Sequence, residues 1–257
     1  MKTVKIVLEQ EKAYLLPLSD LHIGDKAFKE KELQGYIDWV KKEKNALVWL
    51  NGDLMNVATK VSPSSIFDQD LTLEKQIDKV VEIFTPIKDR ILGAISGNHE
   101  QRLESMLGYN PLIPVCKELG IQWCNYSAVL DITVSSKQNK INKNEVPRYT
   151  FYCHHTVGGG GTVGSKINRV AKLREIVSNA DVYVGSHNHQ LAVVPVETRT
   201  YNFRRNKVEA QRQLLVDTGS FLGYSDAYAE MKQLQPSKLG AVRIRMDGRK
   251  KDIHADL

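Results

Sequence analysis

The sequence predicts an α/β fold whose polar residues gather where strands end. Over the first hundred residues, segments with the apolar pattern of a strand alternate with segments of helical spacing, in the order strand, helix, strand, helix, strand. These strands run into short polar clusters. Such an order is typical of layered α/β folds, in which sites lie at the carboxyl ends of the strands.

The expected elements follow from apolar periodicity, with Gly, Pro and polar clusters as boundaries. The first two strands are separated by three polar residues, which predicts a hairpin-like opening; an exposed loop is expected over 135–145 and a short helix near 225–232. Strands are predicted over residues 3–9, 14–18, 46–50, 91–95, 128–134, 149–153 and 181–184, with further strand material over 191–216 and 239–245. Helices are predicted over residues 28–44, 71–85, 101–119 with a break at 110–111, and 164–178.

The composition is that of a soluble globular protein. With 257 residues, 42% of them hydrophobic and 26% charged, the chain fits a single domain over residues 1–257. It contains no apolar run of membrane-spanning length and no signal-peptide pattern, so we expect a cytoplasmic protein with no membrane partner. The three cysteines, an odd number, favour reduced thiols. A net charge of +6 suits a phosphate-bearing partner but is also common in proteins without one.

Six of the seven histidines lie in polar clusters at predicted strand ends, and only His254 lies elsewhere. A turn-capping aspartate or a core histidine explains any one cluster, but not five clusters in the same topological position. Asn98 offers a neutral oxygen ligand and His99 titrates near neutrality, so these neighbours could hold a metal and move a proton. In chain order, the clusters contain Asp20 and His22, then Asp53, then Asn98 and His99, then His154 and His155, then His187 and His189.

The order of these clusters resembles the calcineurin-like metallophosphoesterase superfamily. The pattern of that family is D-x-H, then G-D-x-x-D or a variant, then G-N-H-E or G-N-H-D, then a histidine, then G-H-x-H. The matching segments here are Asp20-Leu21-His22, Gly52-Asp53-Leu54-Met55-Asn56, Gly97-Asn98-His99-Glu100, His154 and His187-Asn188-His189. The resemblance spans residues 19–189 and implies a β-sandwich with helices on both outer faces.

The resemblance also implies a role for each of these residues. Two metal ions would have three ligands each and share a bridge: Asp20, His22 and His189 for one, Asn98, His154 and His187 for the other, and Asp53 between them. Two such ions make hydroxide available near neutral pH as the in-line nucleophile at phosphorus. His99 would steady the phosphoryl oxygens or protonate the leaving oxygen. Mixed nitrogen and oxygen ligands suit manganese, with iron, zinc or nickel as alternatives.

The sequence departs from the family pattern at two positions and offers two histidines at a third. Asn56 replaces the second Asp of the second motif, a residue that in several branches orients the catalytic histidine. Ser186 is inserted before His187, which is a conservative change for a turn. In the fourth motif we prefer His154, the first residue after the strand, and hold His155 in reserve, because successive strand side chains point to opposite faces.

These features predict a dinuclear phosphoesterase, and more specifically a phosphodiesterase or nuclease acting on DNA, RNA or nucleotides. The phosphate-clamping arginines of the phosphoprotein-phosphatase branch are absent, since Val57 follows the second motif and Ser96 precedes the third. Two alternatives stay open: a phosphomonoesterase acting on a small or protein substrate, and a non-catalytic nucleic-acid-binding scaffold on the same fold. Basic positions that suit a nucleic acid are Arg102, Lys166, Arg169, Arg204 and Arg205.

Overall fold

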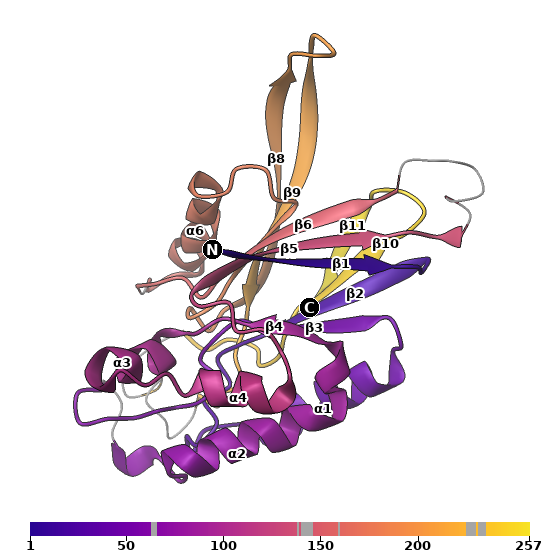
Figure 1. Cartoon of the computed structure of the whole chain (residues 1–257). Helices are drawn as coiled ribbons and strands as arrows, with labels where there is room; N and C mark the ends of the chain where they lie inside the picture. The colour runs from indigo at the N-terminus through magenta and orange to yellow at the C-terminus, as the bar shows by residue number, and fades with distance from the viewer. Residues whose placement is uncertain (63–65, 138, 140–145, 159, 225–229, 231–234) are drawn as a thin grey trace.

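The computed structural model consists of two β-sheets packed face to face, with helices on the outer faces (Figure 1). It describes residues 1–62, 66–137, 139, 146–158, 160–224, 230 and 235–257. Most of the predicted loop 135–145 and of the predicted helix 225–232 therefore lies outside the described residues. The predicted α/β class, with a β-sandwich flanked by helices, is confirmed.

Within the described residues, the larger sheet has six strands and the smaller has five. In spatial order, the larger sheet contains β1 (Lys2–Leu8), β5 (Ser127–Val134), β6 (Arg148–His154), β7 (Val182–Gly185), β9 (Lys207–Thr218) and β8 (Leu191–Asn202). The smaller contains β11 (Ile253–Asp256), β10 (Arg243–Asp247), β2 (Lys12–Leu18), β3 (Ala46–Leu50) and β4 (Ile91–Ala94). The described helices are α1 (Glu30–Lys42), α2 (Leu73–Phe84), α3 (Asn98–Leu107), α4 (Leu112–Leu119) and α6 (Val163–Lys172), with 3-10 turns η1 (Ile66–Asp68), η2 (Thr85–Arg90) and η3 (Leu173–Glu175).

Strand alternation divides the core into layers. On β2 and β3, Leu15 and Trp49 belong to the cluster between the two sheets, whereas Leu16 and Val48 belong to the cluster under α1, α2 and α4. On the other sheet, Tyr152 packs outward into a third cluster beneath α6. Because both faces of each central strand are covered, these strands are apolar throughout, as buried parallel strands are.

Apart from the predicted helix 225–232, the predicted helices and most predicted strands are present within a few residues, but the hairpin-like opening is wrong. β1 pairs in parallel with β5, while β2 pairs in parallel with β3, in the other sheet. The apolar alternation of β1 identifies its buried face, and that face is the same whether the strand lies beside β2 or opposite it. The apolar alternation of β1 therefore does not determine which strand pairs with it.

Parallel pairing brings the polar clusters together at one edge of the sandwich. β2, β3 and β4 run parallel in the smaller sheet, and β6, β7 and β9 run parallel in the larger. Carboxyl ends of parallel strands share an edge, so the residues that follow β2, β3, β4, β6 and β7 meet there. Among the described helices, none has both the length and the apolar character needed to span a bilayer.

Candidate metal centre

Two buried aspartates form the centre of the site. Asp20 follows β2 and Asp53 follows β3, and both are essentially without solvent exposure. One oxygen of each is satisfied: Asp20 Oδ2 accepts from Ser19 Oγ at 2.5 Å, and Asp53 Oδ1 accepts from the His99 backbone N–H at 2.9 Å. The other oxygens, Asp20 Oδ1 and Asp53 Oδ2, accept no hydrogen bond within the described part of the chain. Buried anionic oxygens without donors are costly, and a cation is the partner that fits them.

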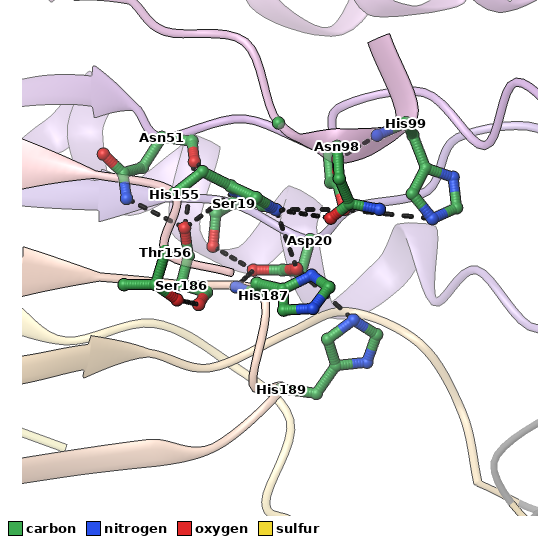
Figure 2. A network of polar contacts seen from close by, with 12 residues as sticks. Ser19, Asp20, Asn51, Asn98, His99, His155, Thr156, Ser186, His187 and His189 are labelled. Atoms are coloured by element: carbon green, nitrogen blue, oxygen red, sulfur yellow. Dashed lines mark hydrogen bonds and ion pairs between the residues drawn. The ribbon is translucent and has the colours of Figure 1, made fainter. Parts of the chain in front are cut away.

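Histidine nitrogens surround these two oxygens. Figure 2 shows the rings of His155, His187 and His189 near Asp20. Potential ligand atoms lie within 4.8 Å of one another in three overlapping groups: Asp20, His22 and His189; His22, Asp53 and His99; and Asp53, His155 and His187. Asp53 belongs to two of the groups, and so does His22. The structure thus brings together every predicted site residue except His154.

The first group contains two imidazole nitrogens that approach each other closely. His22 Nε2 lies 3.2 Å from His189 Nε2, and His189 Nε2 lies 3.3 Å from Asp20 Oδ1. Burial together with His99 and His189 lowers the pKa of His22 well below its usual value, so its ring is neutral. Two imidazole nitrogens and a carboxylate that converge on one point form a donor set for a divalent transition metal.

The second group is built on His155 rather than on the preferred His154. His155 Nε2 lies 3.0 Å from Asp53 Oδ2 and 3.2 Å from Asn98 Oδ1, and its ring is 5.6 Å from the ring of His187. His154 instead accepts a hydrogen bond at Nδ1 from the Thr156 backbone N–H at 2.7 Å. Of the two adjacent histidines, the structure therefore places His155 at the site, and not His154, which the sequence analysis preferred.

The phase of β6 explains this correction. Tyr149, Phe151 and Cys153 point into the cluster between the sheets, so the odd-numbered positions face inward. Tyr152 faces outward beneath α6, as His154 does by the same alternation. His155 continues the inward-facing series just beyond the end of the strand, where the two aspartates lie.

A buried polar network fixes the ring of His155 (Figure 2). Its Nδ1 lies 2.8 Å from the Asn51 carbonyl oxygen and 2.9 Å from Ser186 Oγ. Asn51 Nδ2 donates to the same Ser186 Oγ at 2.9 Å, and Thr156 Oγ1 donates to the Ser186 carbonyl at 2.6 Å. With Nδ1–H donating into this network, Nε2 is left to face Asp53. Sequence reasoning treated Ser186 as a turn residue and missed this network.

A backbone carbonyl orients His99. Its Nδ1 contacts the carbonyl oxygen of Asn56, while Nε2 lies 3.9 Å from Asp53 Oδ2 and the ring is 4.5 Å from that of His22. The Asn56 side-chain nitrogen is buried and has no hydrogen-bond acceptor among the described residues. The contact that holds His99 therefore does not depend on the side chain at position 56, and replacing the family's aspartate leaves it in place.

Glu100 joins the second and third motifs. Its buried carboxylate accepts backbone N–H groups from Gly97 at 2.8 Å, Asp53 at 3.1 Å and Leu54 at 2.9 Å. Burial, with the neighbouring charge of Asp53, raises the pKa of Glu100 to about 7. This carboxylate fixes the Asp53 loop against the start of α3, a role that the motif alone did not reveal.

The charges of the site favour ionised carboxylates. Burial opposes ionisation of Asp53, but His155 and His99 hold the pKa of Asp53 well below its usual value. Likewise, burial works against a charge on His155, yet Asp53 raises the pKa of His155 to about 10. The site therefore favours the ionised form of Asp53, which is the form that a metal ion would bind.

Backbone strain is concentrated in the same residues. Asp20, His22, Asp53, His187 and His189 have φ angles of 49°, 50°, 50°, 74° and 52°, in the left-handed region. This conformation is uncommon for residues other than glycine and costs of order 1 kcal/mol each. Strain at five residues that share one site indicates that their side chains are held there for a function.

No family model and no curated protein matches the chain. A solved structure described as a conserved uncharacterized protein and predicted phosphoesterase from Streptococcus pneumoniae TIGR4 is similar, with 13% identity, a TM-score of 0.37 and coverage of 96% of this chain and 97% of that chain. The calcineurin-like phosphoesterase YfkN from Bacillus subtilis is similar with 13% identity, a TM-score of 0.34 and coverage of 72% and 65%. In motif order, in its two-sheet fold and in the convergence of its strand ends, the chain resembles the calcineurin-like metallophosphoesterase superfamily.

Proposed function

We propose that the chain is a metal-dependent phosphoesterase, and more specifically a phosphodiesterase that acts on nucleic acid. The observation that carries the proposal is the pair of buried carboxylate oxygens without donors, Asp20 Oδ1 and Asp53 Oδ2, surrounded by histidine nitrogens. Oxygen and nitrogen donors without thiolate suit divalent ions such as manganese.

Two ions are expected to share the site. Asp20, His22 and His189 would hold one, and Asn98, His155 and His187 the other, with Asp53 between them. Divalent ions bound there supply Lewis acidity toward a phosphoryl group. The Asp20 side chain is oriented for this role by Ser19 Oγ, which in turn lies 2.5 Å from Thr218 Oγ1.

His99 is the proposed proton donor. Its Nδ1 contacts the carbonyl of Asn56, so its other ring nitrogen is free to face a phosphate ester at the site. The side chain keeps 14% of its surface exposed, whereas that of the neighbouring Asp53 is 1% exposed. Its position lets it contact the phosphoryl oxygens or pass a proton to the leaving oxygen. The amino end of α3 begins beside it and favours negative charge through the helix dipole.

Two features support diesters over monoesters. Phosphate-clamping arginines are absent next to the second and third motifs, where Val57 and Ser96 stand. The chain also has a net charge of +6, which favours a polyanionic substrate.

The test is a comparison of substrates and metals. Purified protein is stripped with a chelator, its metal content is measured, and hydrolysis of bis(p-nitrophenyl) phosphate, p-nitrophenyl phosphate and DNA is followed with manganese, zinc, iron or nickel. We expect activity to require metal, to be highest on the diester, and to be lost in Asp53→Asn. Full activity without metal would refute the metal centre. A monoester preference without nuclease activity would identify a phosphatase, and metal binding without hydrolysis would identify a non-catalytic scaffold.

A further inference from the structure

Strands β8 and β9 continue well beyond the sheet to which they belong. They pair with each other from Leu191↔Thr218 to Asn202↔Lys207, but β9 pairs with β7 only over Leu214–Asp217. Residues 196–213 therefore form a two-stranded ribbon, here called the arm, with no third strand beside it in the described part of the chain. Figure 1 shows the arm standing out from the body of the protein.

The arm holds a large share of the positive charge of the chain. Its 18 residues include five basic and two acidic side chains, a net charge of +3 against +6 for all 257 residues. Glu209 pairs with Arg205 at 3.2 Å, and Glu197 pairs with Arg199 at 3.1 Å. Arg204 and Arg212 are exposed and form no ion pair with any residue that the structure describes. The unpaired charge of the arm is therefore positive.

Aromatic rings lie at the tip of the arm. Phe203 is 87% exposed and Tyr201 is 48% exposed, and their rings meet edge to face with centroids 5.0 Å apart. Val208, the cross-strand partner of Tyr201, is also exposed. Such apolar groups are not expected at the end of a free ribbon, since a two-stranded ribbon has little core of its own to stabilise it.

We propose that the arm binds the sugar-phosphate backbone of a nucleic acid. Exposed arginines complement the charge of phosphates, and exposed aromatic rings can stack on bases. A two-stranded ribbon also has the width that the major groove of a duplex admits. A second copy of the chain is a poorer occupant, because two arms would bring like charges together. The inference rests on the proposed function and extends it to how the substrate is held.

The arm contacts its partner far from the metal centre. β9 runs from Lys207 in the arm to Thr218, whose hydroxyl lies 2.5 Å from Ser19 Oγ beside Asp20. The 12 residues of this extended strand span about 35 Å. A duplex rises about 3.4 Å per base pair, so about ten base pairs are needed to reach both places. We therefore expect the arm to matter for long substrates and not for short ones.

Binding is measured by fluorescence anisotropy with the full chain, in chelator so that the probe stays intact. The probes are a duplex of about 40 base pairs and a single strand of the same length, at about 100 mM salt and above. The arm variant is Arg204→Glu with Arg212→Glu, and Phe203→Ala is a second variant. The matched control reverses the same number of charges with Lys75→Glu and Lys88→Glu, both at exposed lysines. Lys75 is on α2, which lies at the opposite end of the molecule from the arm in Figure 1, and Lys88 is on η2, which directly follows α2 in the chain.

We expect the arm variant to weaken binding at least tenfold and to reduce the slope of log Kd against log salt by about two, with less than twofold change in the control. Loss on the duplex alone would identify groove binding, and loss on the single strand would identify stacking at Phe203. Equal weakening in arm and control variants would overturn the proposal, as would unchanged binding or a dimer that the arm variant dissociates without affecting nucleic acid.

Hydrolysis of bis(p-nitrophenyl) phosphate separates this inference from the proposed function. The arm variant should hydrolyse it at the wild-type rate, because a small diester does not reach the arm. Normal hydrolysis without arm-dependent binding would refute the proposed role of the arm and would leave the proposed activity untouched. If binding depends on the arm but the protein hydrolyses no phosphate ester with any metal, the proposed activity is refuted and the proposed role of the arm is supported.

Discussion

Ser186→Ala tests whether the polar network behind His155 controls the metal centre. The Ser186 hydroxyl is buried and lies 2.9 Å from His155 Nδ1, 2.9 Å from Asn51 Nδ2 and 3.0 Å from the Asn51 carbonyl oxygen. Removing it leaves both donors with one partner each: His155 Nδ1 keeps the Asn51 carbonyl, and Asn51 Nδ2 keeps the His154 carbonyl at 3.3 Å. The side chain is small, so the cavity created is small too.

The expected magnitudes follow from these remaining partners. Since neither donor is left wholly unsatisfied, the free energy of unfolding should fall by about 1 to 2 kcal/mol. Metal affinity should fall more clearly, because groups that orient a histidine ligand typically contribute 10- to 100-fold, or about 1.4 to 2.8 kcal/mol. The His155 ring can then rotate, which moves Nε2 away from Asp53, or exchange its tautomer, which places the proton on Nε2 and prevents it from binding a metal ion.

The assay is manganese binding by titration calorimetry, with thermal unfolding of the chelated protein measured alongside. Ser136→Ala is the control, because this serine is also buried and hydrogen-bonded, at 3.2 Å from Asn139 Oδ1, but lies away from the site. We expect both variants to lose some stability and only Ser186→Ala to lose metal affinity. Wild-type affinity in Ser186→Ala would refute the assignment of this hydroxyl to His155.

Three further predictions follow from the structure. His155→Ala should abolish binding of one metal equivalent, whereas the neighbouring change His154→Ala should retain both equivalents in elemental analysis; the reverse result would reinstate His154 as the ligand. Asn56→Ala should leave the pH dependence of kcat unchanged, because His99 contacts the backbone carbonyl at that position, and a shifted profile would show that the side chain acts on His99. Burial raises the pKa of Tyr149 from 10.0 to about 12, so the folded state holds this proton more tightly, and stability should fall as pH rises from 10 toward 12. Tyr149→Phe should lose this alkaline dependence, and should lower the free energy of unfolding at pH 7 by about 1 to 3 kcal/mol, measured by denaturant titration.

The sequence predicted those site residues that are polar and directly follow an apolar strand. Histidines and aspartates directly after apolar strands are visible in a sequence, because a strand interior excludes them and the following turn admits them. Asp20, Asp53 and His189 were identified in this way, and the structure brings them together. Ser186 could not be identified in this way, because serine is common in turns. Its role depends on a contact with Asn51, which is 135 residues away in the sequence.

The alternation of side chains along β6 was not sufficient to decide whether His154 or His155 faces the site. Alternation assigns neighbours to opposite faces, but the phase must be set by residues whose polarity differs between the two faces. In β6 both faces are covered, with Phe151 and Cys153 toward the other sheet and Tyr152 toward α6. A strand that is apolar on both faces has no polar residue to set the phase, so the sequence alone could not decide.

The metal centre is also where the local rules of folding are broken most often. Left-handed backbone at Asp20, Asp53 and His187, together with buried oxygens without donors, would make this edge of the sandwich unfavourable if nothing bound there. Elsewhere in the described chain, as at the inward-facing Trp49, hydrophobic pattern and packing agree. Such conflicts are expected where binding offsets them, because each one lowers the stability of the fold. The same argument connects the arm to function: Phe203 is the most exposed of the large apolar side chains described, and it lies on the ribbon that carries unpaired arginines rather than on a surface that folding could bury.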